Sequence, residues 1–442
     1  MAKSRNRISG ITVRGFKSIG REQHLDIRPL TILAGANSSG KSSFMQPLLL
    51  LKQTLESPGD SGALLLGGPN VQFTLASQVL SHVPGKGQCN EFAVRIDLLE
   101  NQSLELVFMK EAGKGFELGK MMYRHDRETS IITPGMGHDE IEKLLPKSWK
   151  AMIVDIQKRR GAKLRWEVRR ERCFLVVGVV SSDKSRWGSG FVPDWLSPSR
   201  IFVPLVQGVI HLPGLRGNPS RTYHKTAGGP DFQGTFELYV ASVIAGWQNN
   251  GSKTQAEKLG KALENMGLTW KVKAGSVNDT EVELKVGRLP HSTRGGAHDL
   301  VNIADVGFGV SQSLPVVVAL LAAHPGQLVY LEQPEIHLHP LAQRRLAGIL
   351  KDAVNRGVIA VVETHSALLL REVQTLIAKK ELRKEDVALH WFMRDAHGET
   401  TVQTAELDDN GAYGDWPEDF DKTELEAARE YLDTVEAKGA GK

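Results

Sequence analysis

A glycine-rich segment near the start of the chain carries the side chains best suited to phosphate chemistry. Residues 35–42 read Gly-Ala-Asn-Ser-Ser-Gly-Lys-Ser, which is the spacing G-x-x-x-x-G-K-[ST]. Glycines at these positions let backbone N–H groups converge on phosphate oxygens, Lys41 is placed to reach the β- and γ-phosphates, and Ser42 is placed to ligate Mg²⁺. ATP and Mg²⁺ are therefore the expected cofactors. The residues of this segment expected to contact ATP are Asn37, Ser38, Ser39, Gly40, Lys41, Ser42 and Ser43.

Two apolar strands in the last third of the chain end in polar groups. Residues 328–332 read Leu-Val-Tyr-Leu-Glu, and the next apolar run continues into Glu-Thr-His-Ser at residues 363–366. Ligands of α/β proteins bind where the carboxyl ends of such strands meet. We expect Glu332 to hold Mg²⁺ together with Ser42, and His365 to lie at the same edge. The nearby histidines at 337 and 339 lack the ligand number and helical spacing of a zinc site.

The elements around the glycine-rich segment suit it to bind an anion. Alternating apolar residues predict strands near residues 11–16 and 24–27, and the continuous apolar run Leu30–Leu33 predicts a buried strand. An apolar helix is expected over Ser42–Leu55, ending at the Ser-Pro-Gly breaker of residues 57–59. A buried strand before the loop and a helix after it direct the helix dipole at a bound phosphate.

The last third of the chain alternates between apolar helices and fully apolar strands. The expected order is helix 311–323, strand 328–331, helix 340–355, strand 358–362 and helix 366–378. Fully apolar strands separated by helices are typical of parallel strands buried in an α/β sheet. We therefore predict an α/β fold in this region.

The middle of the chain is less regular and contains one concentration of positive charge. Strands are expected near residues 92–99, 104–108 and 174–180, and a helix runs from about 252 to 267. Residues 158–172 place basic side chains at nearly alternate positions, which predicts an edge strand or a hairpin with one basic face. Both a solvated face and a polyanion contact remain open. The side chains for a DNA contact would be Lys158, Arg159, Arg160, Arg165, Arg169 and Arg170.

Composition excludes several classes of protein. The 442 residues carry a formal net charge of +4, two cysteines and no apolar run long enough to span a membrane. The basic, polar N-terminus lacks the apolar segment of a secretory signal. We expect a folded cytoplasmic protein with reduced thiols, no membrane contact and about three modules by length.

Taken in order, these motifs resemble ABC-type ATPases of the structural-maintenance-of-chromosomes (SMC), RecF and overcoming-lysogenization-defect (OLD) kind. More closely, they resemble the stand-alone predicted AAA-type ATPases of bacterial defence islands. The similarity is carried by Ile-Thr-Val-Arg-Gly-Phe-Lys-Ser at 11–18, by Leu-Glu-Gln-Pro-Glu-Ile-His-Leu-His-Pro at 331–340, and by Glu-Thr-His-Ser at 363–366. Residues 411–420 resemble the short C-terminal module that these ATPases often carry. In this family Lys17, in the first turn, is expected to contact ATP.

The resemblance implies a P-loop NTPase head of the α/β class, with a mixed sheet flanked by helices and interrupted by an insertion. The head would be split between residues 1–55 and 296–400. Residues 56–295 would form a strand-rich lobe followed by a helical subdomain, and residues 401–442 the C-terminal module.

The resemblance also implies a signature motif that contacts ATP bound to a partner subunit, so that two ATPs hold two heads together head to tail, as a dimer or a higher oligomer. Residues 305–312, just before an apolar helix, are the candidate. The usual serine is missing unless Ser311 replaces it. The residues expected to make this contact are Gly307, Gly309, Ser311 and Gln312.

The catalytic set implied by the resemblance contains one unusual residue. The family register places Gln333 where a water-polarising glutamate is usual, and an amide can orient water but cannot accept its proton. Either Glu335 or His365 then accepts the proton, or hydrolysis is slow and ATP acts as a clamp. The expected catalytic residues are Glu332, Gln333, Glu335 and His365, with turnover of about 1 s⁻¹ or less. Gln72 and Gln78 are alternative candidates for the glutamine that senses Mg²⁺.

Three functions remain open. One is an ATP-driven switch that controls DNA or a separately encoded effector, such as a nuclease or toxin, in antiphage defence. Another is a nucleotide-dependent scaffold or a DNA-maintenance ATPase without an effector. The third is a subunit of an ATP-gated nuclease, but the 75 or so residues after His365 leave little room for a nuclease domain, and Asp408-Asp409 is typical of a turn.

Overall fold

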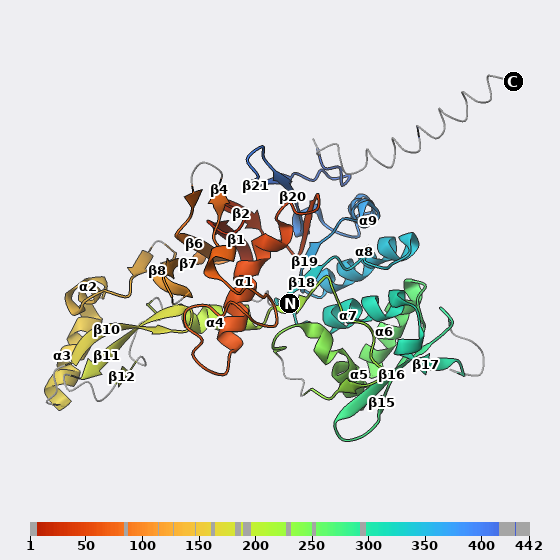
Figure 1. Cartoon of the computed structure of the whole chain (residues 1–442), viewed down its shortest axis with the longest axis horizontal. Coiled ribbons are helices and arrows are strands. Elements are labelled where there is room, and N and C mark those ends of the chain that lie inside the picture. Colours follow the sequence, from red (N-terminus) through yellow and green to blue (C-terminus); the bar gives the residue numbers. More distant parts are fainter. Residues whose placement is uncertain are drawn as a thin grey trace.

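A six-stranded sheet carries the glycine-rich loop at its carboxyl edge (Figure 1). The computed structural model describes residues 7–83, 87–113, 115–126, 128–145, 147–160, 164–181, 187–188, 196–226, 231–249, 253–291, 298–414 and 429. The strands, in their order across the sheet, are β13 (Ile210–Leu212), β18 (Leu328–Glu332), β19 (Ile359–Glu363), β3 (Leu30–Gly35), β20 (Val387–Arg394) and β21 (Thr400–Ala405). Neighbouring strands are parallel except β20 and β21, which are antiparallel. The predicted α/β class with a mixed sheet is confirmed.

The central strands are apolar because both of their faces are covered. Along β18, Tyr330 packs into one hydrophobic core while Val329 and Leu331 pack into the other. Successive side chains of a strand point to opposite faces, so one short apolar segment contributes to two layers. This leaves the strand ends as the place where polar side chains reach solvent.

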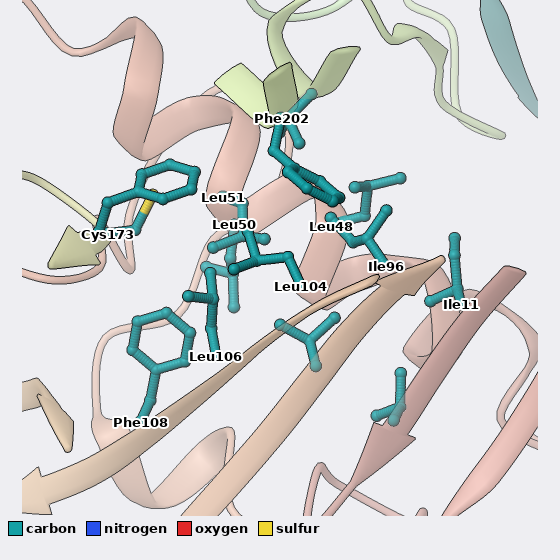
Figure 2. Packing of buried hydrophobic residues seen from close by; sticks show 14 of the residues in the cluster. Ile11, Leu48, Leu50, Leu51, Ile96, Leu104, Leu106, Phe108, Cys173 and Phe202 are labelled. Atoms are coloured by element: carbon teal, nitrogen blue, oxygen red, sulfur yellow. The ribbon is translucent and has the colours of Figure 1, made fainter. Parts of the chain in front are cut away.

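A second sheet and helix α1 (Lys41–Glu56) cover the first face. This antiparallel sheet has the order β2-β1-β6-β7-β8-β9. Its strands are β1 (Ile8–Arg14), β2 (Gln23–Asp26), β6 (Glu91–Leu98), β7 (Gln102–Glu111), β8 (Gly115–His125) and β9 (Glu128–Ile132). Figure 2 shows Leu48 and Leu51 of α1 packed with Ile96 and Leu104 of this sheet and with Phe202 of α4 (Ser199–Gln207). The helix that begins at the nucleotide loop is therefore clamped between two sheets.

Helices and a small sheet cover the second face. The helices are α5 (Val240–Asn249), α6 (Lys253–Asn265), α7 (Phe308–Ala322), α8 (Pro340–Asn355) and α9 (Ala367–Ala378). The small sheet contains β14 (Tyr223–His224), β15 (Val272–Ser276), β16 (Glu281–Gly287) and β17 (Leu300–Asn302). The shorter elements are η1 (Ala76–Gln78), β4 (His82–Val83), β5 (Gly87–Gln88), η3 (Phe236–Tyr239), η4 (Ile303–Asp305) and η5 (Lys384–Asp386). Proline at the first position of α8 and the preceding His339 cap fit its observed start.

A lateral lobe extends from the antiparallel sheet (Figure 1). It contains α2 (His138–Leu144), α3 (Lys147–Arg160), β10 (Leu164–Glu171), β11 (Phe174–Ser181) and β12 (Trp187–Gly188). The strand or hairpin predicted for residues 158–172 is wrong for its first part, because Lys158, Arg159 and Arg160 end helix α3 and only residues from 164 onward form β10. The alternation of side chains holds in β10, where Trp166 and Val168 are buried.

The segment expected to be an insertion, residues 56–295, contributes to both sheets of the head. Strand β13 pairs with β18, and strand β6 pairs with β1. At the carboxyl side, Tyr413 donates a hydrogen bond to the Leu370 carbonyl of α9 at 3.1 Å. The Trp416-Pro417 part of the predicted C-terminal module lies outside the described residues. None of the helices in the described ranges combines the length and apolar character needed to span a membrane.

Candidate nucleotide-binding site

The glycine-rich loop follows β3 and leads directly into α1. Lys41 is buried, and its Nζ donates hydrogen bonds to the carbonyl oxygens of Gly35 at 3.0 Å and Ala36 at 2.8 Å. Burial lowers the pKa of Lys41, while the charges of Glu363 and Glu335 oppose that shift. The loop thus folds around its own ammonium group, in the place where a phosphate would compete for it.

Contacts from β20 and β21 hold the loop from outside. Arg394 donates from Nε to the Ser38 carbonyl at 2.6 Å, and the Thr400 hydroxyl donates to the Ser39 carbonyl at 2.7 Å. Gly40 has φ +106°, and a Cβ atom there would lie 2.3 Å from Thr400 Oγ1. Only glycine fits both this backbone conformation and this close approach.

The predicted loop residues differ in exposure. Asn37 and Ser38 are exposed at the rim, whereas Ser42 and Ser43 are half-buried in the first turn of α1. Ser39 is buried, and its hydroxyl has no hydrogen-bond partner among the described residues.

Ser42 contacts a carboxylate that the sequence analysis did not assign. Its hydroxyl donates to Oε1 of Glu363 at 2.9 Å, and the Tyr330 hydroxyl donates to Oε2 of the same side chain at 3.0 Å. Burial and the charge of Glu332 raise the pKa of Glu363, and the Ser42 hydrogen bond and Lys41 oppose this. The available signal was that Glu363, like Glu332, ends an apolar strand.

Glu332, the predicted metal ligand, is engaged elsewhere. His211 donates from Nε2 to Oε1 at 3.1 Å, and the backbone N–H of Gly214 donates to Oε2 at 3.2 Å. The Asn70 side-chain amide lies 3.0 Å from His211 Nδ1 and so helps to orient the ring. Burial alone would raise the pKa of Glu332, but the hydrogen bond and charge of His211 lower it below its usual value. His211 was not predicted, since a single histidine within an apolar run is a weak signal.

The turn after β18 is tied to the neighbouring strand. Gln333 has φ +43°, and its backbone N–H donates to the Glu363 carbonyl at 2.8 Å. Glu335 Oε1 accepts from the Thr364 hydroxyl at 2.7 Å and from the His365 N–H at 2.8 Å. Among the described residues Glu335 Oε2 is buried without a partner, and burial raises the pKa of this carboxyl. The four predicted catalytic residues therefore lie at the carboxyl ends of β18 and β19.

His365 lies beside the loop that begins at Gly35. Burial and the nearby charge of Lys41 lower the pKa of His365, while a hydrogen bond involving Gly35 opposes this shift. A neutral imidazole at this position is able to accept a proton or to donate one hydrogen bond to a phosphate.

The predicted signature residues divide into two groups at the start of α7. Gly307 and Phe308 are exposed, and the first N–H groups of a helix lack intrahelical partners. Ser311 and Gln312 are buried instead: the Ser311 hydroxyl donates to the Phe308 carbonyl at 3.2 Å, and Gln312 Nε2 donates to the Arg216 carbonyl at 3.1 Å. In this arrangement the outward-facing part of the motif is the backbone near Gly307 and Gly309.

Arg216 joins the start of α7 to the turn after β18, and its role was not predicted. It is 7% exposed, donates from Nη2 to the Gln333 carbonyl at 3.0 Å and lies 3.4 Å from Gln312 Oε1 through Nε. Its Nη1 has no partner among the described residues. Burial lowers the pKa of Arg216, and the charges of Glu335, Glu237 and Glu332 oppose this. The segment Leu-Pro-Gly-Leu-Arg-Gly at 212–217 was the available signal.

Lys17 and the two glutamine candidates have local partners. Lys17 Nζ donates to Gln46 Oε1 at 3.0 Å and lies 5.1 Å from the centre of the Phe73 ring. The side chain of Gln78 accepts from the backbone N–H groups that precede η1, so it caps that short helix. Gln72 is exposed.

Three of the six basic residues proposed for DNA contact are paired with acids. Arg170 forms two hydrogen bonds with Asp60, both at 2.9 Å. Ion pairs also join Arg159 to Asp155 at 2.9 Å and Arg169 to Glu167 at 3.2 Å. Divided between a helix and a strand, these side chains do not form one continuous basic strand face.

The oxygen atoms at the carboxyl edge fit a hard divalent cation. Hydroxyl and carboxylate oxygens are the ligands that Mg²⁺ prefers, and Ser42 and Glu363 supply them beside Lys41. The loop, the start of α1 and Lys41 supply the positive electrostatics for a polyphosphate. The arrangement therefore suits binding of a nucleoside triphosphate together with Mg²⁺.

The solved structures to which the chain shows similarity include heads of SMC proteins. The chain is similar to the structure "SmcHead bound to the C-winged helix domain of ScpA" at 12% identity and a TM-score of 0.46, over 91% of this chain and 98% of that chain. The SMC head domain from Thermotoga maritima is 10% identical with a TM-score of 0.37, over 90% of this chain and 99% of that chain. The Smc head domain with a coiled coil and joint derived from Pyrococcus yayanosii is 10% identical with a TM-score of 0.44, over 92% of this chain and 98% of that chain. No curated protein shows significant similarity to the chain.

A family model matches the part of the head that carries the acidic strand ends. Residues 271–371 match the family described as "AAA domain, putative AbiEii toxin, Type IV TA system". The match includes α7, Glu332 and the Glu363–Ser366 segment, and the glycine-rich loop lies outside it. Residues 271–371, about a quarter of the chain, are therefore similar to an AAA-type domain, and β18 and β19 of this match belong to the mixed sheet that carries the glycine-rich loop.

Proposed function

We propose that this chain binds ATP with Mg²⁺ at the carboxyl edge of its central sheet and hydrolyses it slowly, so that ATP holds two heads together. One observation carries the proposal: Lys41 and Ser42 lie beside the carboxylate of Glu363, while an amide, Gln333, takes the position expected for the catalytic base. The positive charge and the oxygen ligands support nucleotide binding. The amide of Gln333 cannot remove a proton from water, which supports slow hydrolysis.

The chain's own residues suggest how hydrolysis proceeds. Lys41 would leave the loop carbonyls to neutralise the phosphates, and Gln333 would orient the attacking water through its amide oxygen. The unpartnered Oε2 of Glu335 is the oxygen available to accept the proton. Bound Mg²⁺ would neutralise charge on the transferring phosphoryl group. We expect turnover of about 1 s⁻¹ or less.

Apolar side chains around the site support closure against a second copy. Leu215 is 92% exposed. Its neighbour Gly214 donates to the Glu332 carboxylate, and its other neighbour, Arg216, donates to the Gln333 carbonyl. Phe308 at the start of α7 is 50% exposed and lies against the His337 ring, with 5.6 Å between the ring centres. Exposed large apolar side chains gathered near a site are typical of a surface that another protein covers.

The biological role that we propose is a switch for a separately encoded effector in antiphage defence. The description of the matching family, which names a toxin and a toxin–antitoxin system, supports that context. A scaffold in which ATP binding matters more than turnover is the second candidate, and Gln333 favours it. If DNA is bound through the lateral lobe, its affinity will fall steeply with salt and will be lost when Arg159 and Arg169 become Glu.

The test is mass photometry with and without ATP, together with phosphate release, on the wild type and two variants. Lys41→Ala should abolish ATP-dependent dimers because the phosphates lose their lysine, and Glu335→Gln should retain dimers but slow turnover further. Lys273→Ala, on an exposed strand position, is the matched control. A wild type that stays monomeric with ATP, or one that turns over tens of ATP per second unaffected by Glu335→Gln, would refute the model.

A further inference from the structure

We propose that Glu363, rather than Glu332, is the carboxylate that holds the metal beside Ser42. This inference rests on the proposed ATP and Mg²⁺ binding and names the residue that makes the metal site. It departs from the expectation drawn from the motif order, in which Glu332 takes that role.

Strand order places Glu363 nearer to the nucleotide loop. Strand β19 lies directly beside β3, with Glu363 in register with Leu33, two residues before the loop begins. Glu332 lies opposite Glu363 on β18, one strand farther away. Neighbouring strands are about 4.8 Å apart, so Glu332 starts about 10 Å from the strand that delivers Ser42.

The distance between Ser42 and Glu363 suits two ligands of one cation. Mg²⁺ binds oxygen at about 2.1 Å in octahedral geometry, so two adjacent ligands lie about 3 Å apart. Ser42 Oγ and Glu363 Oε1 are 2.9 Å apart. A cation bound to the Ser42 hydroxyl is therefore within direct reach of Oε1, or separated from it by one of its own water ligands.

Tyr330 is a positioning residue for this carboxylate. It is fully buried, and its hydroxyl donates to Oε2 of Glu363 at 3.0 Å, which directs Oε1 toward Ser42. The aromatic ring stacks on His211, with ring centres 5.5 Å apart and an interplanar angle of 12°. The side chain that orients Glu363 is thus itself fixed by packing.

Glu332 has both of its oxygens engaged on the side away from β3. Oε1 accepts from His211 and Oε2 accepts from the N–H of Gly214, and both donors come from the segment around β13. Each carboxylate oxygen keeps a second lone pair, so these hydrogen bonds do not themselves block a metal, but they hold the Glu332 carboxylate toward the β13 segment. Its contacts suit it to anchoring the segment that carries Arg216.

The experiment measures metal binding separately from turnover. Free Mn²⁺, the probe, is followed by electron paramagnetic resonance in the presence of ATP, and ATP binding alone is measured in EDTA. Glu363→Gln should weaken Mn²⁺ binding about tenfold or more while ATP binding in EDTA is unchanged. Glu332→Gln should change Mn²⁺ affinity by less than about threefold, and so should the control Glu372→Gln on α9, whose carboxylate pairs with Arg344. Because Ser42 and Glu363 would act on one cation, Ser42→Ala with Glu363→Gln should lose less than the product of the two single losses.

Each result separates this inference from the function on which it rests. Loss of Mn²⁺ affinity in Glu332→Gln with little change in Glu363→Gln overturns the inference and leaves ATP binding intact. A wild type that binds neither ATP in EDTA nor Mn²⁺ with ATP refutes the proposed function itself. If Glu363→Gln fails to fold by circular dichroism, Glu363→Asp and Tyr330→Phe replace it. Metal affinity unchanged in both would overturn the inference equally.

Discussion

Acid should destabilise the strand that supports the nucleotide loop, through one buried histidine. His390 lies on β20, opposite Leu33 of β3, and its side chain is fully buried. Its Nε2 is 2.9 Å from the Asp26 carbonyl and its Nδ1 is 2.9 Å from Thr404 Oγ1. Burial lowers the pKa of His390 from 6.5 to about 4, and the hydrogen bond to Asp26 only partly opposes this.

The sign and size of the effect follow from proton binding. Between pH 6.5 and about 4 the unfolded chain holds a proton on His390 that the folded chain does not. Stability from this residue is therefore complete above pH 6.5 and falls as the pH drops toward 4. A pKa difference of about 2.5 corresponds to about 3 kcal/mol when fully expressed, and to about 2 kcal/mol at about pH 5.

Urea unfolding at about pH 7.5 and about pH 5 measures this loss. His390→Gln keeps a neutral polar side chain but removes the titration, so its free energy of unfolding should fall by about 2 kcal/mol less than that of the wild type between the two pH values. The exposed His397→Gln is the control and should behave as the wild type. Equal losses in the wild type and His390→Gln would refute the reasoning.

Three further substitutions test the site and its support. Gly40→Ala should abolish ATP binding, because its Cβ atom would meet Thr400 Oγ1 at 2.3 Å in a left-handed backbone conformation; calorimetry measures this. Arg216→Met should keep the free energy of unfolding within about 1.5 kcal/mol of the wild-type value, because an apolar side chain replaces a buried charge. It should reduce ATP-dependent dimers, because the link from α7 to the turn after β18 is lost. Lys52→Met should cost about 3–5 kcal/mol in urea unfolding, because it leaves Glu56 buried without its ion pair.

Each of these three substitutions has a control or a result that would contradict it. Gly59→Ala, where no atom lies within 4 Å of the added Cβ, should bind ATP normally. Adding Glu56→Gln to Lys52→Met should recover part of the lost stability, and no recovery would show that the charge was not the cause. Dimers of Arg216→Met equal to those of the wild type would show that the arginine does not couple the two segments.

Local sequence signals predicted the elements of the head because those signals are short-range. Helix α8 was predicted over residues 340–355 and has these bounds, since proline marks its start and its apolar spacing is regular. Residues 158–160 show the limit of the method. Alternating charges suggested a strand there, but the chain continues the helix begun at Lys147, whose Trp149 packs against the hydrophobic core.

The sequence by itself determined the nucleotide loop, the helix that follows it and the two apolar strands that end in Glu332 and Glu363, because spacing and apolar runs are local properties. Which carboxylate meets Ser42 was decided only by the tertiary structure, since strand order is not written in chain order. The later strand, β19, is placed between β18 and β3. His211 and Arg216 reach the site for the same reason: β13, more than a hundred residues before Glu332 in the chain, pairs directly with the strand that carries it.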